Sequence, residues 1–125
     1  MTGRTFTLSI PAPAGWLSSN HRRDRRAETG DRQAWREAAG WRARQAKLPK
    51  LERIHIVAWL SFGDKRRRDA HNYMPTLKAI VDGLVDVGVL PDDDDKHLTG
   101  PDLRRAPDDG TGCARAVTLS IEEVC

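Results

Sequence analysis

The segment from residue 72 to residue 87 constrains the fold most, because its apolar residues recur at helical spacing. They follow one another at intervals of three or four positions: Leu77, Ile80, Val81 and Leu84. That spacing puts them on one face of an amphipathic helix. Pro75 falls in the first turn, where proline is tolerated, and Gly88 is a suitable stop. The sequence therefore predicts a helix over residues 72–87.

Other stretches alternate between apolar and polar residues, as half-buried strands do. Residues 5–10 and 114–122 each place their apolar side chains on one face. Residues 98–105 form a weaker candidate, because Gly100-Pro101 interrupts the pattern. These three segments are predicted to be strands.

A fourth strand is predicted over residues 53–62, which are apolar on both faces. Such a strand is typical of the centre of a sheet. His55 lies within it and is therefore predicted to be a core or interface histidine, not a metal ligand.

Residues 31–46 are rich in Ala, Arg, Gln and Glu, which favour a helix, and Pro49 closes the segment. Trp35 and Trp41 in this helix are predicted to pack on the core, because tryptophan in an amphipathic helix usually covers apolar surface. The element order is then β-α-β-α-β-β. That order favours an α/β (α+β) fold, with a mixed sheet and two helices, in a single domain over residues 1–125.

The composition is that of a globular chain, with 38% hydrophobic and 31% charged residues among 125. Its apolar runs fall well short of the roughly 20 residues that a membrane span requires, so we expect no membrane insertion. The first residues also lack the basic and then apolar stretch of a secretory signal, and we expect a cytoplasmic protein. Cys113 and Cys125 fit that compartment as free thiols.

Charge is unevenly distributed along the chain. Residues 1–50 hold eleven Lys and Arg against four Asp and Glu, whereas residues 51–125 hold ten against fourteen. Residues 11–30 are rich in Pro, Gly and Ser and then strongly basic, which predicts an exposed, mobile loop within the domain. A merely solvated surface can show the same imbalance, so charge alone does not assign a function.

Acidic residues flank the predicted helix on both sides. Asp69 precedes it, directly after the basic run from Lys65 to Arg68, and the Asp92-Asp93 pair follows it. Magnesium takes oxygen ligands and is commonly held by one or two carboxylates plus substrate phosphate. If the chain bends back over the helix, these carboxylates could share a metal that assists phosphodiester hydrolysis.

Lys78 lies one or two turns into the same helix and could place an ammonium group near the charge that develops during hydrolysis. Its spacing also allows a plain surface pair with Asp82, and periodicity alone favours this alternative. The basic run beside Asp69 would bind a polyanion such as duplex DNA, with an affinity that falls as salt rises. The basic residues at 21–26 could bind a second strand of the DNA.

Several short motifs follow one another in register: Arg66-Arg67-Arg68-Asp69-Ala70-His71-Asn72, then Lys78 with Asp82-Gly83-Leu84, then Gly88-Val89-Leu90-Pro91-Asp92-Asp93. This pattern resembles the RusA family of Holliday junction endonucleases. The likeness is strong over residues 64–105, and the flanking strands agree in order and length. In that family a homodimer binds a four-way DNA junction and makes paired, magnesium-dependent nicks in opposing strands. The resemblance implies the same here, together with a phage or prophage origin.

The resemblance also implies roles for individual residues. Asp69, Lys78 and Asp93 match the catalytic positions of the family, and the two acids would hold Mg²⁺, with Mn²⁺ as an alternative. His71 stands where the family pattern has a second aspartate, and imidazole is a poor magnesium ligand. Either His71 serves as a ligand or proton carrier, or another acid takes over: Asp92, Asp94 or Asp82.

The predicted DNA-binding residues come from the two basic segments and one turn: Asn20, Arg22, Arg23, Arg25, Arg26, Lys65, Arg66, Arg67 and Arg68. The predicted function is a dimeric, metal-dependent endonuclease that resolves four-way junctions in recombination and repair, with no organic cofactor. Two alternatives stay open. One is a branched-DNA-binding protein of the same fold that lacks catalysis because of His71, and the other is a general nuclease or RNase with no preference for branches.

Overall fold

The computed structural model describes residues 2–20 and 24–124. Its elements, with a short 3₁₀ helix before the second α-helix, are β1 (Thr2–Pro11), α1 (Arg25–Gln45), β2 (Ile54–Ser61), η1 (Ala70–Tyr73), α2 (Met74–Asp86), β3 (Leu98–Arg105) and β4 (Ala116–Val124). The predicted order of strands and helices and the α+β class are confirmed. The first two residues of the predicted second helix, 72 and 73, belong instead to the separate 3₁₀ helix η1.

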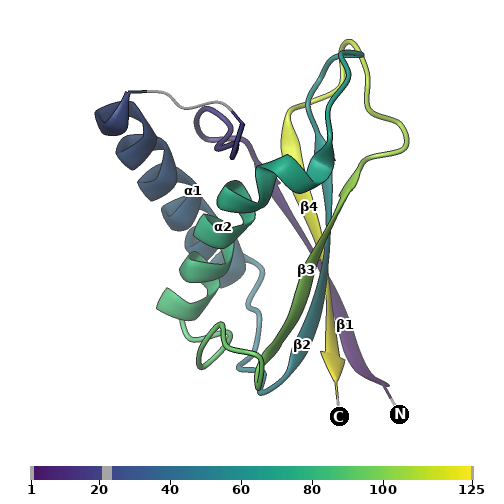
Figure 1. The fold of residues 1–125 in the computed structure, drawn as a ribbon. Coiled ribbons are helices and arrows are strands. Elements are labelled where there is room, and N and C mark those ends of the chain that lie inside the picture. The colour runs from purple at the N-terminus through teal and green to yellow at the C-terminus, as the bar shows by residue number, and fades with distance from the viewer. Residues whose placement is uncertain (1, 21–23, 125) are drawn as a thin grey trace.

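The strands form one mixed sheet in the order β1-β4-β2-β3. β4 runs antiparallel to both β1 and β2, whereas β2 and β3 are parallel. A parallel pair needs a long crossover connection, and the segment containing α2 supplies it. Both helices lie on the same face of the sheet (Figure 1). β2 has a neighbour on each side, as its apolar sequence predicts.

The core lies between the helices and the face of the sheet that they cover. Along β2 every second side chain is buried: Ile54, Ile56, Ala58 and Leu60. The alternate residues are only half-buried, because neither described helix covers the other face. His55 belongs to that other face, and its Nε2 lies 2.6 Å from a carboxylate oxygen of Asp102. His55 therefore does not lie in the core, which was one of the two places predicted for it, and that part of the prediction is wrong.

The two helices approach most closely at Gly83 of α2. A Cβ atom added there would lie 2.2 Å from the Arg36 carbonyl oxygen of α1, and one added at Gly40 would lie 3.2 Å from the Gly83 carbonyl oxygen. The apolar face of α2 is buried as its periodicity predicts. The absence of a side chain at Gly83 thus lets the two backbones touch and fixes how α1 lies across α2.

α1 begins at Arg25, earlier than the predicted start at residue 31. The Asp24 carboxylate accepts a hydrogen bond from the Arg26 N–H at 3.0 Å and caps the helix. In the preceding segment, Leu17 is buried, and its N–H and carbonyl groups both bond to the Thr76 hydroxyl. The predicted loop over residues 11–30 is therefore shorter than predicted, because residues 25–30 are helical, and Leu17 within it is bonded to α2.

Trp41 also departs from the prediction. Trp35 is fully buried, as predicted, but Trp41 is 61% exposed. Their separation of six residues corresponds to about 240° around a helix, so both side chains cannot face one core. In β3, the predicted interruption at Gly100-Pro101 is absorbed by a shift of register against β2, and the strand is continuous.

None of the helices in the described ranges is long and apolar enough to cross a membrane. Cys113 is an exposed, free thiol, in agreement with the prediction. Cys125 lies outside the described residues.

Candidate active site

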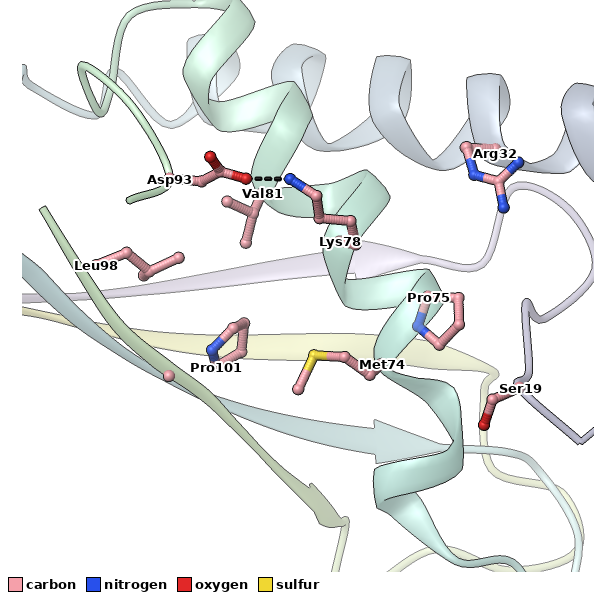
Figure 2. A pocket seen from close by; sticks show the side chains of 10 residues that line it. Ser19, Arg32, Met74, Pro75, Lys78, Val81, Asp93, Leu98 and Pro101 are labelled. Carbon is pink, nitrogen blue, oxygen red and sulfur yellow. Dashed lines mark hydrogen bonds and ion pairs between the residues drawn. The ribbon is translucent and has the colours of Figure 1, made fainter. Parts of the chain in front are cut away.

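Lys78 joins two carboxylates on the surface of α2. Its ammonium nitrogen donates to Asp82 Oδ1 at 3.1 Å, one turn further along the helix, and to Asp93 Oδ2 in the loop that follows α2. Figure 2 shows the contact between Lys78 and Asp93. The surface pair expected from periodicity is therefore present, and Asp93 shares the same ammonium group.

The loop after α2 turns back because the residues at its start enter the core. Gly88 adopts a left-handed conformation, with φ of 81°, at the end of the helix. Val89 and Leu90 are then buried. Asp92 Oδ1 accepts a hydrogen bond from the Asp93 N–H at 2.7 Å and fixes the turn. The predicted site requires the chain to turn back toward α2 after the helix ends, and this turn places Asp93 beside α2.

The contact between Lys78 and Asp93 favours the charged form of both groups. Hydrogen bonding to the carboxylates, first that of Asp93, raises the pKa of Lys78 above its usual value. The hydrogen bond from Lys78 lowers the pKa of Asp93. Both groups are therefore charged at neutral pH. The Lys78 side chain is 58% exposed, so a ligand can still reach it.

Lys78 and Asp93 line a cavity of about 620 Å³. Its apolar wall comes from α2 and β3: Met74, Pro75, Val81, Leu98 and Pro101. Ser19 and Arg32 add polar groups, and Figure 2 shows Lys78 between Asp93 and Arg32. An apolar wall with a few polar groups is typical of sites that bind small organic molecules.

Asp69 lies at a different place. It precedes η1, is exposed, and lines a smaller hollow of about 200 Å³ with Asn20, Arg67 and Arg68. Asp69 Oδ1 is 4.0 Å from Arg67 Nε. His71, in η1, is also exposed. The structure therefore places the acid before the helix and the acid after it in separate hollows.

Residues 18–20 run between these two hollows. Ser19 lines the cavity, and Asn20 lines the smaller hollow. The Ser19 N–H and hydroxyl groups both donate to the Asn72 carbonyl oxygen, at 2.9 and 3.2 Å. This segment is thus fixed to η1, and a ligand that extends along it could reach both hollows.

A complete metal-binding group is not assembled in the part of the chain that the structure describes. Within residues 2–20 and 24–124, no three His, Cys, Asp or Glu side chains converge in a way that could hold an ion. The donor types do fit magnesium, since Asp69, Asp92 and Asp93 all offer carboxylate oxygens. The metal site stays a prediction, with one or two of these carboxylates and a substrate phosphate as its ligands.

The predicted DNA-binding residues differ in their surroundings. Six of them are exposed: Asn20, Arg25, Arg26, Lys65, Arg66 and Arg67. Arg68 is instead an anchor, since its guanidinium bonds to Asp64 at 2.7 Å and to the Tyr73 hydroxyl at 3.1 Å, and lies 4.8 Å from the Phe62 ring centroid. Arg22 and Arg23 lie outside the described residues.

Asp109 holds the loop that carries this basic run. Its carboxylate is 1% exposed and accepts hydrogen bonds from the Phe62 and Gly63 N–H groups and from Arg105 Nε, each at 2.9 Å. Burial by itself would raise the pKa of Asp109, but these hydrogen bonds outweigh burial and hold the pKa below its usual value. Arg105 in turn donates to the Arg66 carbonyl oxygen at 2.6 Å. The position of the basic run therefore depends on one buried carboxylate.

We expect Asp109→Ala to lower the free energy of unfolding by about 2 kcal/mol at pH 7, because buried N–H groups and Arg105 lose their acceptor. Asp108→Ala, which changes an exposed neighbour, is the matched control and should shift that free energy by less than about 0.5 kcal/mol. Folding lowers the pKa of Asp109. The ionised carboxylate therefore contributes fully to the free energy of unfolding above the ordinary pKa of 3.8, and this contribution is lost as the pH falls through the pKa of the folded state. Urea unfolding should show a smaller difference between wild type and Asp109→Ala at pH 3 than at pH 7. An equal difference at both pH values would contradict this account.

Arg32 and Met74 line the cavity, and neither was predicted from the sequence as a site residue. Arg32 lies at the cavity because of the way α1 crosses α2 at Gly83. The residue pattern of α1 alone does not predict that crossing. Met74 carried no usable signal, because it lies three positions before Leu77 and seven before Val81, at the edge of the apolar stripe, where a buried side chain is expected. It is 41% exposed.

A scan against models of protein families found no match to this chain, and neither did a search of curated proteins.

Proposed function

We propose that this protein is a metal-dependent, structure-selective DNA endonuclease of the RusA type, which resolves four-way junctions by paired phosphodiester hydrolysis. The observation that carries the proposal is the convergence of Lys78 and Asp93, fifteen positions apart in the chain, at one cavity. These are two of the three residues that match catalytic positions in the RusA-like pattern. The third, Asp69, lies in the smaller hollow, which Asn20 also lines.

The surrounding charges suit a nucleic acid. Lys65, Arg66 and Arg67 stand exposed on the loop before Asp69, and clustered basic side chains of this kind bind phosphates with little dependence on base sequence. Arg25 and Arg26 add exposed positive charge at the start of α1. Together these two basic clusters offer phosphate contacts on different elements, as a branched substrate requires.

The chemical roles follow from charge and position. Lys78 would place its ammonium group near the negative charge that develops on the phosphate, where a fixed cation lowers the barrier. Asp93 orients Lys78 and keeps it protonated, as the raised pKa of Lys78 indicates. One or two of the carboxylates of Asp69, Asp92 and Asp93, together with a substrate phosphate, would hold Mg²⁺, which when bound polarises a phosphate and activates water. A homodimer would supply two such sites for paired nicks.

The test is a cleavage assay with labelled four-way junction, linear duplex and single strand, each with Mg²⁺, Mn²⁺ or EDTA. We expect symmetric nicks in the junction alone, in the presence of either metal and not in EDTA. Cutting of all three substrates would point to a general nuclease. The absence of both cutting and binding would overturn the proposal.

A second candidate is a branched-DNA-binding protein without catalysis. It is favoured by His71, an exposed imidazole where the family pattern has a carboxylate. This candidate predicts tight junction binding with no product in any metal, and the same assay separates it from the first.

A further inference from the structure

We propose that the cavity beside Lys78 binds one unstacked nucleotide of the branched DNA, with its base against Met74 and Pro101 and its phosphate at Arg32. This inference rests on the proposed function and deepens it by assigning a nucleotide subsite. It also gives Arg32 a role as a phosphate-positioning residue.

The shape and lining of the cavity fit a nucleotide base. A volume of about 620 Å³ falls within the ~300–1,000 Å³ of sites that hold small organic ligands. Met74 is 41% exposed, although it is a large apolar residue. A thioether makes favourable contacts with aromatic rings, and the Pro75 and Pro101 rings extend the same apolar wall. A base would cover surface that is otherwise left to water.

The charges around the cavity determine where the phosphate lies. Lys78 already contacts two carboxylates, so most of its charge is matched within the protein. Arg32 is exposed, and its guanidinium group makes no hydrogen bond or ion pair with any residue that the structure describes. A guanidinium group binds phosphate through two parallel hydrogen bonds. Arg32 is therefore the cation at the cavity whose charge is not matched within the described residues. It also lies away from the Asp93 carboxylate, which would repel a phosphate.

This arrangement also gives a reason for preferring branched DNA. Extruding a base from a regular duplex costs a few kcal/mol, and the cost is smallest where the base is already unpaired or poorly stacked. Bases at a branch point are of that kind. With Arg32 and Asp93 on opposite sides of Lys78 in Figure 2, a nucleotide held at Arg32 would bring its neighbouring phosphodiester toward Lys78. The subsite would thus select the position of the nick.

The two methionines of the chain allow a direct test. Protein labelled with ¹³C at the methionine methyl groups gives two signals, and Met74→Leu identifies the one from Met74. A four-way junction and an adenine-rich pentanucleotide are added without divalent metal, so that no cutting occurs, while fluorescence polarisation of labelled DNA reports binding independently. We expect the Met74 methyl signal to move upfield as the DNA binds, because an adjacent base ring shields it.

Two arginine variants complete the test. Arg32→Gln should weaken junction binding by about tenfold or more, as for loss of a hydrogen bond to a charged group, and reduce the Met74 shift. Arg44→Gln removes an exposed arginine from the same helix outside the cavity and should weaken binding by less than about twofold. Equal effects of the two variants would overturn the role of Arg32.

The remaining outcomes separate this inference from the function on which it rests. DNA binding with an unmoved Met74 signal overturns the nucleotide subsite and leaves the proposed function standing. A Met74 signal that moves with protein concentration in the absence of DNA means that a second copy of the chain covers the cavity, which also overturns the inference. If polarisation detects no DNA binding at all, both the inference and the proposed function fail.

Discussion

Gly83→Ala is expected to lower the free energy of unfolding by about 3 kcal/mol, at the upper end of the range for overpacking. The added methyl group would lie 2.2 Å from the Arg36 carbonyl oxygen. A backbone oxygen cannot rotate away as a flexible side chain can, so α1 and α2 must move apart. That movement would also open the apolar contacts that both helices make with the sheet.

The matched control is Gly30→Ala, which changes a glycine in α1 where, apart from the adjacent backbone of the helix itself, no atom lies within 4 Å of the added methyl group. Alanine is the better helix former, so this variant should be more stable than wild type by up to about 1 kcal/mol. Thermal and urea unfolding of the two variants measure both effects. If Gly83→Ala stabilises the protein as Gly30→Ala does, the backbones of α1 and α2 do not approach closely at Gly83.

Asp93→Asn is expected to reduce junction cutting by at least about 100-fold, the size of loss found when one electrostatic contributor is removed from an active site. The substitution keeps the shape of the side chain but removes the charge that holds Lys78 in place and that would bind a metal. Junction affinity should be unchanged or higher, because the DNA meets one negative charge fewer. Single-turnover cutting rates and polarisation measurements separate the two quantities.

Asp95→Asn is the control for this experiment. Asp95 is an exposed acid in the same run of four aspartates, and it lines neither the cavity nor the hollow around Asp69. Its loss should change the cutting rate by less than about threefold, through the general field of the protein alone. Wild-type cutting by Asp93→Asn would remove Asp93 from the site. An equal loss in both variants would mean that only the net charge of the loop matters.

Local patterns predicted the parts of the fold that local chemistry determines. The spacing of Leu77, Ile80 and Leu84 predicted α2, because a helix repeats its contacts within a few residues. Alternation predicted β1 and β4 for the same reason, and a run that is apolar on both faces predicted β2. The start of α1 was missed, although the Asp24 cap is also local, since a basic sequence rich in turn residues concealed it.

The candidate site could be predicted only in part. The positions of Lys78 and Asp93 followed from register with a known pattern, and the structure brings these two residues together. The same pattern did not predict that Asp69 would lie in a separate hollow. It also did not predict that Arg68 would be tied to Asp64 and Tyr73 rather than extended toward solvent.

The sequence by itself determined which segments become helices and strands and which residues carry charge, because those properties depend on neighbours within a few positions. Only the tertiary structure decided that α1 crosses α2 at Gly83 and that Arg32 therefore reaches the cavity beside Met74. Such contacts join residues more than forty positions apart, and they depend on how the backbones of two helices fit against each other. Helical spacing within either segment contains no record of that fit.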